Sequence, residues 1–190
     1  MHSLKQLIIF LLFCFISAEK QQKNRTVFYN YSAINIDGDT IQMSEYKNKK
    51  ILLVNVASKC GYTSQYKDLQ KLHENYYNKL IVLGFPSNDF LGQEPGNNSD
   101  IKAFCQREYG ITFQMFEKIH VKGKKQHPLY QWLTDDKKNG WNNKKPTWNF
   151  CKYLIDEEGN LIEYFGPSIN PLDSMIVKHI NKKQQLLLPP

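Results

Sequence analysis

One cysteine lies where a buried strand is expected to give way to a helix. The apolar run Ile51–Val56 predicts the strand, a small-residue turn containing Cys60 follows, and apolar residues at helical spacing begin at Tyr66. At such a junction, backbone N–H groups and the positive end of the helix dipole stabilise a thiolate over a thiol. Cys60 is therefore a candidate nucleophile, although unpaired cysteines also serve as small buried apolar residues.

The residues beside Cys60 limit the chemistry that it can perform. Lys59 adds a positive charge next to the thiol, and Thr63 or Ser64 is a candidate N-cap for the helix. The stretch Cys60-Gly61-Tyr62-Thr63 resembles the Cys-x-x-Cys site of thioredoxins with its second cysteine replaced by threonine. An oxidised Cys60 must therefore find its disulfide partner elsewhere.

Three sequence blocks together resemble the signatures of one enzyme family. Residues 54–63 are similar to the active-site signature of glutathione peroxidases, with cysteine where many members carry selenocysteine. Residues 84–96, which read Gly-Phe-Pro-Ser-Asn-Asp-Phe-Leu-Gly-Gln-Glu-Pro-Gly, resemble the second signature, and Trp148-Asn149-Phe150 resembles the third. The blocks follow the family's order, and the similarity covers about residues 27–180. The resemblance implies a peroxidase that reduces hydrogen peroxide and organic or lipid hydroperoxides.

The same resemblance implies a catalytic tetrad of Cys60, Gln93, Trp148 and Asn149. A Cys60 thiolate would attack one peroxide oxygen and become a sulfenic acid. Neutral indole and amide donors suit this reaction, because they can hydrogen-bond the thiolate and then the departing oxygen. Without the resemblance, Trp148 is typical of a core aromatic residue and Gln93 of a solvated loop residue, whereas asparagine in the strand expected at Asn149 is unusual.

Cys105 is a candidate resolving cysteine. It lies on a helix expected from Ser99, the candidate N-cap, to Tyr109, and its place on the apolar stripe of that helix predicts a buried residue. Residues 104–110 resemble the helix that carries the resolving cysteine in two-cysteine members of the family, which implies a Cys60–Cys105 disulfide. The Cα atoms of a disulfide lie within about 7 Å of each other, so this pairing would need local opening of the helix.

Three further positions bear on the site. Ser87 stands where family members commonly have cysteine, which removes another possible resolving thiol. Asp89 stands where they commonly have glutamine and places a carboxylate near the site. Cys151 follows the third block and is expected to pack in the core, with a mixed disulfide to a partner as the alternative.

The resemblance implies no resident cofactor, but a thiol reductant as co-substrate: glutathione, a thioredoxin-class protein or a protein disulfide isomerase. The histidines are scattered without metal-ligand spacing, and beyond general basicity there is no nucleic-acid-binding motif. The basic clusters 122–125 and 137–145 are suited to attract glutathione carboxylates or anionic lipid peroxides, although a solvated lysine-rich face is the default interpretation. An insertion that builds a tetramer interface in some relatives is missing between Gly110 and Phe116, so we expect a monomer.

The sequence is also compatible with two other functions. One is a thiol–disulfide oxidoreductase, which the missing Cys-x-x-Cys motif disfavours. The other is a non-catalytic, thioredoxin-like redox-sensing or binding module. A rapid reaction of Cys60 with peroxide separates the peroxidase from both.

The elements that must position these residues predict an α/β, thioredoxin-like fold. Apolar strands at 51–56 and 80–85 flank a helix of about 64–78, and this βαβ unit predicts a parallel pair at the centre of the sheet. A second hairpin is expected from 148–155 and 161–165, and a last helix after Asn170-Pro171. Together with an N-terminal β-hairpin around Asp37-Gly38, this order predicts a central mixed sheet flanked by helices.

The 190 residues are 41% hydrophobic, which suits one globular domain with a sizeable core. Residues 1–18 have the layout of a signal peptide: a basic start, a short apolar run and small residues before a polar segment. We therefore expect a polar lead-in at 19–26, a peroxidase domain at 27–183 and a tail at 184–190, in a chain that enters the secretory pathway and, once cleaved, is not inserted in the membrane. An uncleaved anchor is the alternative.

Overall fold

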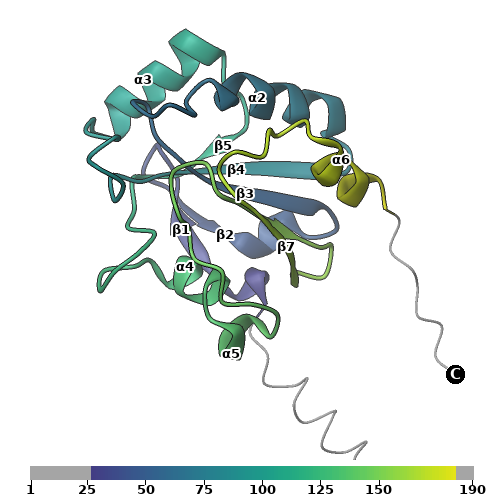
Figure 1. Cartoon of the computed structure of the whole chain (residues 1–190). Helices are drawn as coiled ribbons and strands as arrows, with labels where there is room; N and C mark the ends of the chain where they lie inside the picture. The colour runs from purple at the N-terminus through teal and green to yellow at the C-terminus, as the bar shows by residue number, and fades with distance from the viewer. Residues whose placement is uncertain (1–26, 183–190) are drawn as a thin grey trace, which may run out of the picture.

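A five-stranded mixed sheet forms the middle layer of the computed structural model, which describes residues 27–182 (Figure 1). Its order is β5-β4-β3-β6-β7; β3, β4 and β5 run parallel, whereas β6 pairs antiparallel with both β3 and β7. The strands are β3 (Lys50–Val56), β4 (Leu80–Pro86), β5 (Gln114–Met115), β6 (Lys152–Ile155) and β7 (Leu161–Phe165). The predicted fold class and the parallel pair at the centre of the sheet are confirmed.

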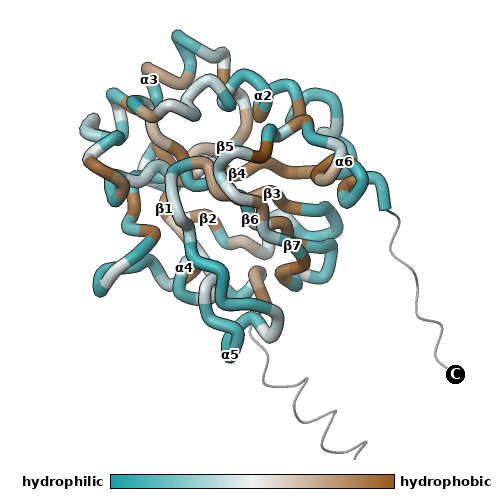
Figure 2. The backbone as a smooth tube through the Cα atoms, viewed as in Figure 1, coloured by the Kyte–Doolittle hydropathy of each residue, from teal (hydrophilic) through white to brown (hydrophobic). Residues whose placement is uncertain are grey.

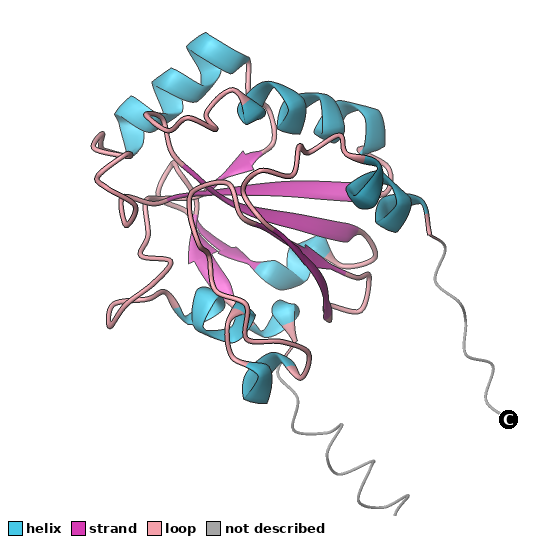
Figure 3. Ribbon diagram, in the orientation of Figure 1, coloured by secondary structure: helices cyan, strands magenta, loops and turns pink. Residues whose placement is uncertain are grey.

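Helices cover both faces of this sheet (Figure 3). One face carries α2 (Gln65–Tyr76), α3 (Asn98–Tyr109) and α6 (Ser174–Asn181). The other side holds the predicted N-terminal hairpin and short helices: η1 (Phe28–Asn30), β1 (Ser32–Ile34), β2 (Thr40–Gln42), η2 (Met43–Tyr46), α4 (Pro128–Leu133) and α5 (Asp136–Asn139).

The core is divided into two apolar clusters, one on each face of the sheet, because successive side chains of a strand point to opposite sides. In β3, Leu53 belongs to the cluster under α4, whereas Leu52 and Val54 pack under α2. All seven residues of β3 are buried, as expected for a central strand covered on both faces. Figure 2 shows the corresponding hydrophobic colouring along the central strands.

The sheet topology brings three connecting segments to one edge. Because β3 and β4 are parallel and Val56 pairs with Pro86, the loops that follow both strands leave from the same edge. Because β6 is antiparallel to β3 and Lys152 pairs with Val54, the segment that precedes β6 arrives at that edge as well. Cys60, Gln93 and Trp148-Asn149 lie in these three segments.

Two sequence-based boundaries were wrong. Residues 148–151, predicted as strand, form a turn before β6. The N-cap of α3 is Asn97 and not Ser99, because the Asn97 side chain accepts the N–H of Asp100 while the Asp100 carboxylate accepts the N–H of Asn97. Gly110 is the C-cap of α3 and adopts the left-handed conformation, φ 59°.

Several expectations fall on residues that the structure does not describe. They are the signal peptide 1–18, the lead-in 19–26 and the tail 184–190. Within residues 27–182, no helix is both long enough and apolar enough to cross a membrane.

Replacing the N-cap of α3 is expected to weaken the domain. Asn97→Ala removes the acceptor for the Asp100 N–H and should lower the free energy of unfolding by about 1 kcal/mol. Urea denaturation measures the change. The matched control is Ser99→Ala, since the Ser99 hydroxyl only donates to the Asn97 side chain; an equal loss in that variant would contradict the assignment of the cap.

Candidate active site

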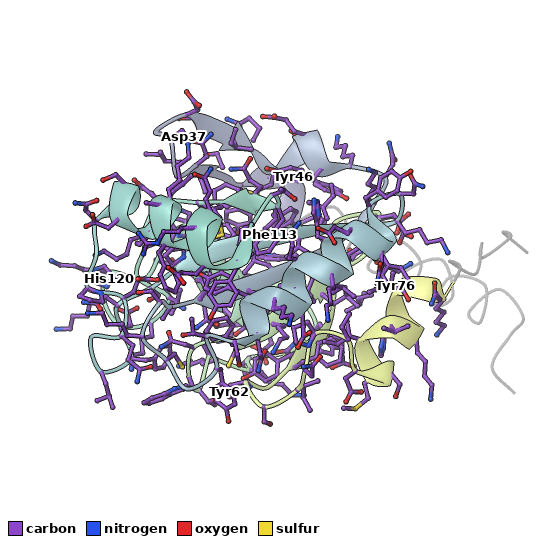
Figure 4. All side chains as sticks on the ribbon, turned by 90° about the horizontal axis from the view of Figure 1, so that it is seen from above. Asp37, Tyr46, Tyr62, Tyr76, Phe113 and His120 are labelled. Atoms are coloured by element: carbon purple, nitrogen blue, oxygen red, sulfur yellow. The ribbon has the colours of Figure 1, made fainter. Side chains whose placement is uncertain are left out.

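Cys60 lies in the turn between β3 and α2, and of the three cysteines in residues 27–182 it alone is partly exposed. The backbone N–H of Tyr62 donates to its Sγ at 3.4 Å. The Thr63 hydroxyl closes the turn, because it accepts the Cys60 N–H at 2.9 Å and donates to the Ala57 carbonyl at 2.8 Å. Figure 4 labels Tyr62 and Tyr76, which lie near the two ends of α2.

The sulfur therefore receives its backbone donor from the turn and not from the first residues of the helix. Helix α2 begins at Gln65, and Ser64 occupies the N-cap position without a side-chain capping bond. Of the two candidate N-caps, Ser64 holds the position, and Thr63 makes turn contacts instead. A thiolate at this position would be stabilised by the Tyr62 N–H.

Gln93 is held between the other two segments of the site. Its backbone carbonyl accepts the Lys59 N–H at 3.0 Å, and its side-chain Oε1 accepts the Asn149 amide at 3.0 Å. Asn149 is fully buried, and within the described residues its Oδ1 has no hydrogen-bond partner. The expected neighbours of Cys60 thus lie at one edge, with Gln93 bonded to both the Cys60 turn and Asn149.

The turn that contains Trp148 and Asn149 is fixed to the centre of the sheet by Asn55 of β3. The Asn55 amide donates to the Trp148 carbonyl at 2.9 Å, and the Asn55 carbonyl accepts the Phe150 N–H. Phe150 has φ 66°, the left-handed conformation that side chains rarely adopt, so this turn depends on its surroundings. The partly exposed Trp148 ring packs on Phe90, with ring centroids 5.6 Å apart.

Two buried charged residues in the site region were missed by sequence reasoning. Glu94 is fully buried and accepts the Ser58 hydroxyl at 2.6 Å. Burial raises the pKa of its carboxyl, against the opposing effects of the Ser58 hydrogen bond and of Lys118 and Lys59. Lys152, at the start of β6, is also fully buried. The sequence offered one signal for each residue: Glu94 directly follows Gln93, and Lys152 stands at the start of an apolar run.

Cys105 is 1% exposed on α3, so its prediction as a buried helix residue is confirmed. Burial raises the pKa of its thiol to about 11, with the Tyr66 hydroxyl beside it opposing the rise. The Tyr66 ring packs against Phe104, Tyr109 and Phe150. A cavity of about 360 Å³ borders Cys105 between the N-terminal hairpin, α3 and residues 111–115.

The structure also shows the surroundings of the three further positions noted in the sequence, Cys151, Ser87 and Asp89. Cys151 is fully buried and accepts the Tyr164 hydroxyl at 3.3 Å, which confirms its packing in the core. Ser87 is buried as well. The Asp89 carboxylate lies 2.7 Å from His120 Nδ1 and accepts the backbone N–H groups of Val121 and Lys122, so it is engaged by the 120–122 segment.

The two basic clusters are mostly exposed, and one of them reaches the site region. Lys122 Nζ lies 4.3 Å from the centroid of the Phe90 ring, which in turn contacts Trp148. Among residues 27–182, no group of three or more His, Cys, Asp or Glu side chains is placed to hold a metal ion.

Comparisons with known proteins agree on one family. The family model described as "Glutathione peroxidase" matches residues 28–134. A glutathione peroxidase of Lactococcus lactis subsp. cremoris is 48% identical over 145 residues, 76% of this chain and 92% of that protein. The crystal structure of T. cruzi GPX1 is 29% identical with a TM-score of 0.62, covering 81% of this chain and 93% of that one.

A thioredoxin-family thiol:disulfide interchange protein from Chlorobium tepidum superposes with a TM-score of 0.58 at 17% identity, over 79% of this chain and 92% of that one. At that identity the likeness concerns the fold alone.

Proposed function

Because this chain belongs to the glutathione peroxidase family and is a peroxidase, we propose that Cys60 is its peroxidatic nucleophile. The observation that carries the proposal is the convergence at one edge of the sheet. A partly exposed sulfur there accepts a backbone N–H, and the adjoining backbone is bonded to Gln93, which is itself bonded to Asn149. Neutral donors next to a thiol suit a reaction in which negative charge moves from sulfur to oxygen.

The proposed first step is attack of the Cys60 thiolate on one oxygen of a hydroperoxide. The O–O bond breaks, Cys60 becomes a sulfenic acid, and the other oxygen leaves as an alkoxide or hydroxide that takes up a proton. The Gln93 amide and the Trp148 indole would donate to the departing oxygen, while Asn149 orients Gln93 through its Nδ2. Hydrogen peroxide and organic or lipid hydroperoxides are the proposed substrates.

The proposed second step returns the sulfenic acid to a thiol. Cys105 would attack the Cys60 sulfur, forming a Cys60–Cys105 disulfide and releasing water, after local opening of α3 exposes the buried thiol. A thioredoxin-class protein or a protein disulfide isomerase would then reduce the disulfide. Glutathione is the alternative reductant, acting directly on the Cys60 sulfenic acid.

A donor comparison tests the resolving role. In Cys105→Ser, turnover with thioredoxin or protein disulfide isomerase is expected to fall to the background rate, because no intramolecular disulfide can form. Turnover with glutathione should persist if that thiol attacks Cys60 directly. NADPH-coupled assays with each donor measure both.

The matched control for that variant is Cys151→Ser, which also removes one buried thiol but leaves the proposed pair intact. It should keep turnover with every donor that supports the unsubstituted protein. Full turnover of Cys105→Ser with the protein donors would show that Cys105 does not resolve Cys60.

We further propose that the protein acts in the secretory pathway as a monomer. The basic start and apolar run of residues 1–18 support the location, and the missing insertion between Gly110 and Phe116 supports the monomer. A disulfide isomerase is the reductant that fits this compartment best.

A further inference from the structure

Lys152 places a buried amine directly behind the Trp148–Phe150 turn. Its side chain is 0% exposed, between its strand neighbours Val54 and Phe165. Its Nζ donates to two backbone carbonyls, that of Phe150 at 2.8 Å and that of Ile169 at 2.6 Å. Within residues 27–182 it forms no ion pair with a carboxylate.

The two carbonyls belong to two separate segments of the chain. Phe150 follows Asn149 directly and holds the left-handed conformation described above. Ile169 lies in the loop between β7 and α6, in which the Pro167 carbonyl accepts the Gln65 side-chain amide at 2.7 Å. Since Gln65 is the first residue of α2, Lys152 links the Trp148–Asn149 turn to the loop that holds the start of α2.

Burying this lysine opposes folding. Burial lowers its pKa to about 7, against about 10.4 for an unperturbed lysine. Between these two pH values the unfolded chain keeps a proton that the folded lysine has released, so the contribution of Lys152 to stability rises with pH and is lowest below about pH 7. Stability alone therefore does not explain an ammonium at this position.

Few ionisable groups face Lys152 from the elements around it. The neighbouring Cys151 thiol, if ionised, would raise its pKa. Val54 of β3 and Phe165 of β7 are apolar, and His179 of α6 packs on the Phe165 ring with Glu163 of β7 at 3.9 Å from its Nε2. The 166–173 loop contributes the Ile169 carbonyl, and Asp68 of α2 is bonded to Asn170 of that loop.

We propose that Lys152 is a positioning residue for the peroxide reaction, whose ammonium holds Trp148 and Asn149 in place through the Phe150 carbonyl and whose deprotonation loosens that turn. Burial as such favours the neutral amine, but the hydrogen bonds that the buried amine makes to the Phe150 and Ile169 carbonyls are roughly twice as strong when it is charged, so the clamp is strongest while the amine carries its proton. The proposal rests on the role of Cys60 proposed above.

The first test is the rate of Cys60 oxidation by hydrogen peroxide, followed by stopped flow from pH 5.5 to 9 in the unsubstituted protein and in Lys152→Met. We expect Lys152→Met to react about 10- to 100-fold more slowly at pH 6, because small misplacements of catalytic groups have effects of this size. The ratio of the two rates should shrink with a midpoint near the pKa of Lys152. Taking a ratio cancels the shared dependence on the Cys60 thiolate.

Lys50→Met is the matched control. Lys50 is also a buried lysine at the start of a central strand, but it pairs with Glu157 at the opposite end of the sheet. Its replacement should leave the rate of Cys60 oxidation and its pH profile unchanged.

A spectroscopic measurement separates positioning from a general loss of structure. In Cys60→Ser protein, which cannot react, the NMR signal of the Trp148 indole N–H should shift with a midpoint near pH 7, and this shift should vanish in Lys152→Met. If Lys152→Met does not fold, the proposal is tested by the titration of the Trp148 signal in the Cys60→Ser protein, which keeps Lys152. A Trp148 signal that does not shift with pH in that protein overturns the proposal.

The outcomes are distinguishable. An unsubstituted protein that does not react with peroxide contradicts the function proposed for Cys60 and not the clamp, which the Trp148 titration still tests. A reactive protein whose Lys152→Met variant reacts equally fast at every pH shows that Lys152 does not position the site.

Discussion

Cys60→Ser is expected to abolish the reaction with hydroperoxides. A serine hydroxyl is not ionised at neutral pH and forms no sulfenic acid, so the rate of peroxide consumption should fall roughly 10⁴-fold or more, as for other lost nucleophiles. The measurement is a titration of the purified protein with hydrogen peroxide, with free thiols counted by a chromogenic reagent and the oxidised residue located by mass spectrometry. The unsubstituted protein should lose one thiol rapidly, at Cys60.

The other cysteines supply the controls for this experiment. Cys105 and Cys151 are both buried, so neither should react quickly with peroxide in Cys60→Ser. Rapid oxidation of either one in that variant would move the nucleophile away from Cys60. If the unsubstituted protein did not react at all, a redox-sensing or binding module would explain the fold better than a peroxidase mechanism.

Asn149→Ala is expected to give the second largest effect. Alanine removes the donor that holds the Gln93 side chain, and an additional amide from the neighbourhood of the sulfur. Losing one preorganised donor costs about 10²- to 10³-fold in rate, and we expect a loss of this size in the rate constant for Cys60 oxidation. Stopped-flow measurement under single-turnover conditions isolates that step from the reductant.

Asn139→Ala is a matched control for this change. Asn139 is 3% exposed and donates to the carbonyls of Trp132 and Asn142, away from the Cys60 segment. Its replacement should lower stability and leave the rate of Cys60 oxidation unchanged. A rate loss in both variants would mean that Asn149 acts only through the stability of the domain.

The central part of the fold was predictable because the sequence pattern within each segment is enough to indicate its secondary structure. Strands β3 and β4 are continuous apolar runs, as parallel strands buried on both faces must be, and the helix between them has a clear apolar stripe. The turn at residues 148–151 could not be predicted from the sequence. It depends on a hydrogen bond from Asn55, 93 residues away from Trp148 in the chain, and on the left-handed conformation of Phe150. Sequence patterns of one segment do not reveal such contacts.

The candidate site was predictable to the extent that residue identity matches a known pattern. The three blocks gave Cys60, Gln93, Trp148 and Asn149, and the topology explains why they share an edge. Glu94 and Lys152 were not found, because charged residues usually lie at the surface and their burial becomes visible only in three dimensions.

The firm anchoring of α3 has a consequence for survival of the enzyme under stress. Asn97 and Gly110 cap both ends of the helix, and Cys105 is enclosed beneath it. If Cys105 must emerge to meet a freshly oxidised Cys60, the lifetime of the sulfenic acid is set by how often that helix frays. A second peroxide molecule arriving within this interval would convert Cys60 to a sulfinic acid, which thiols cannot repair. Under the proposed Cys60–Cys105 pairing, the capping of this one helix would therefore set the dose of oxidant above which the protein inactivates itself.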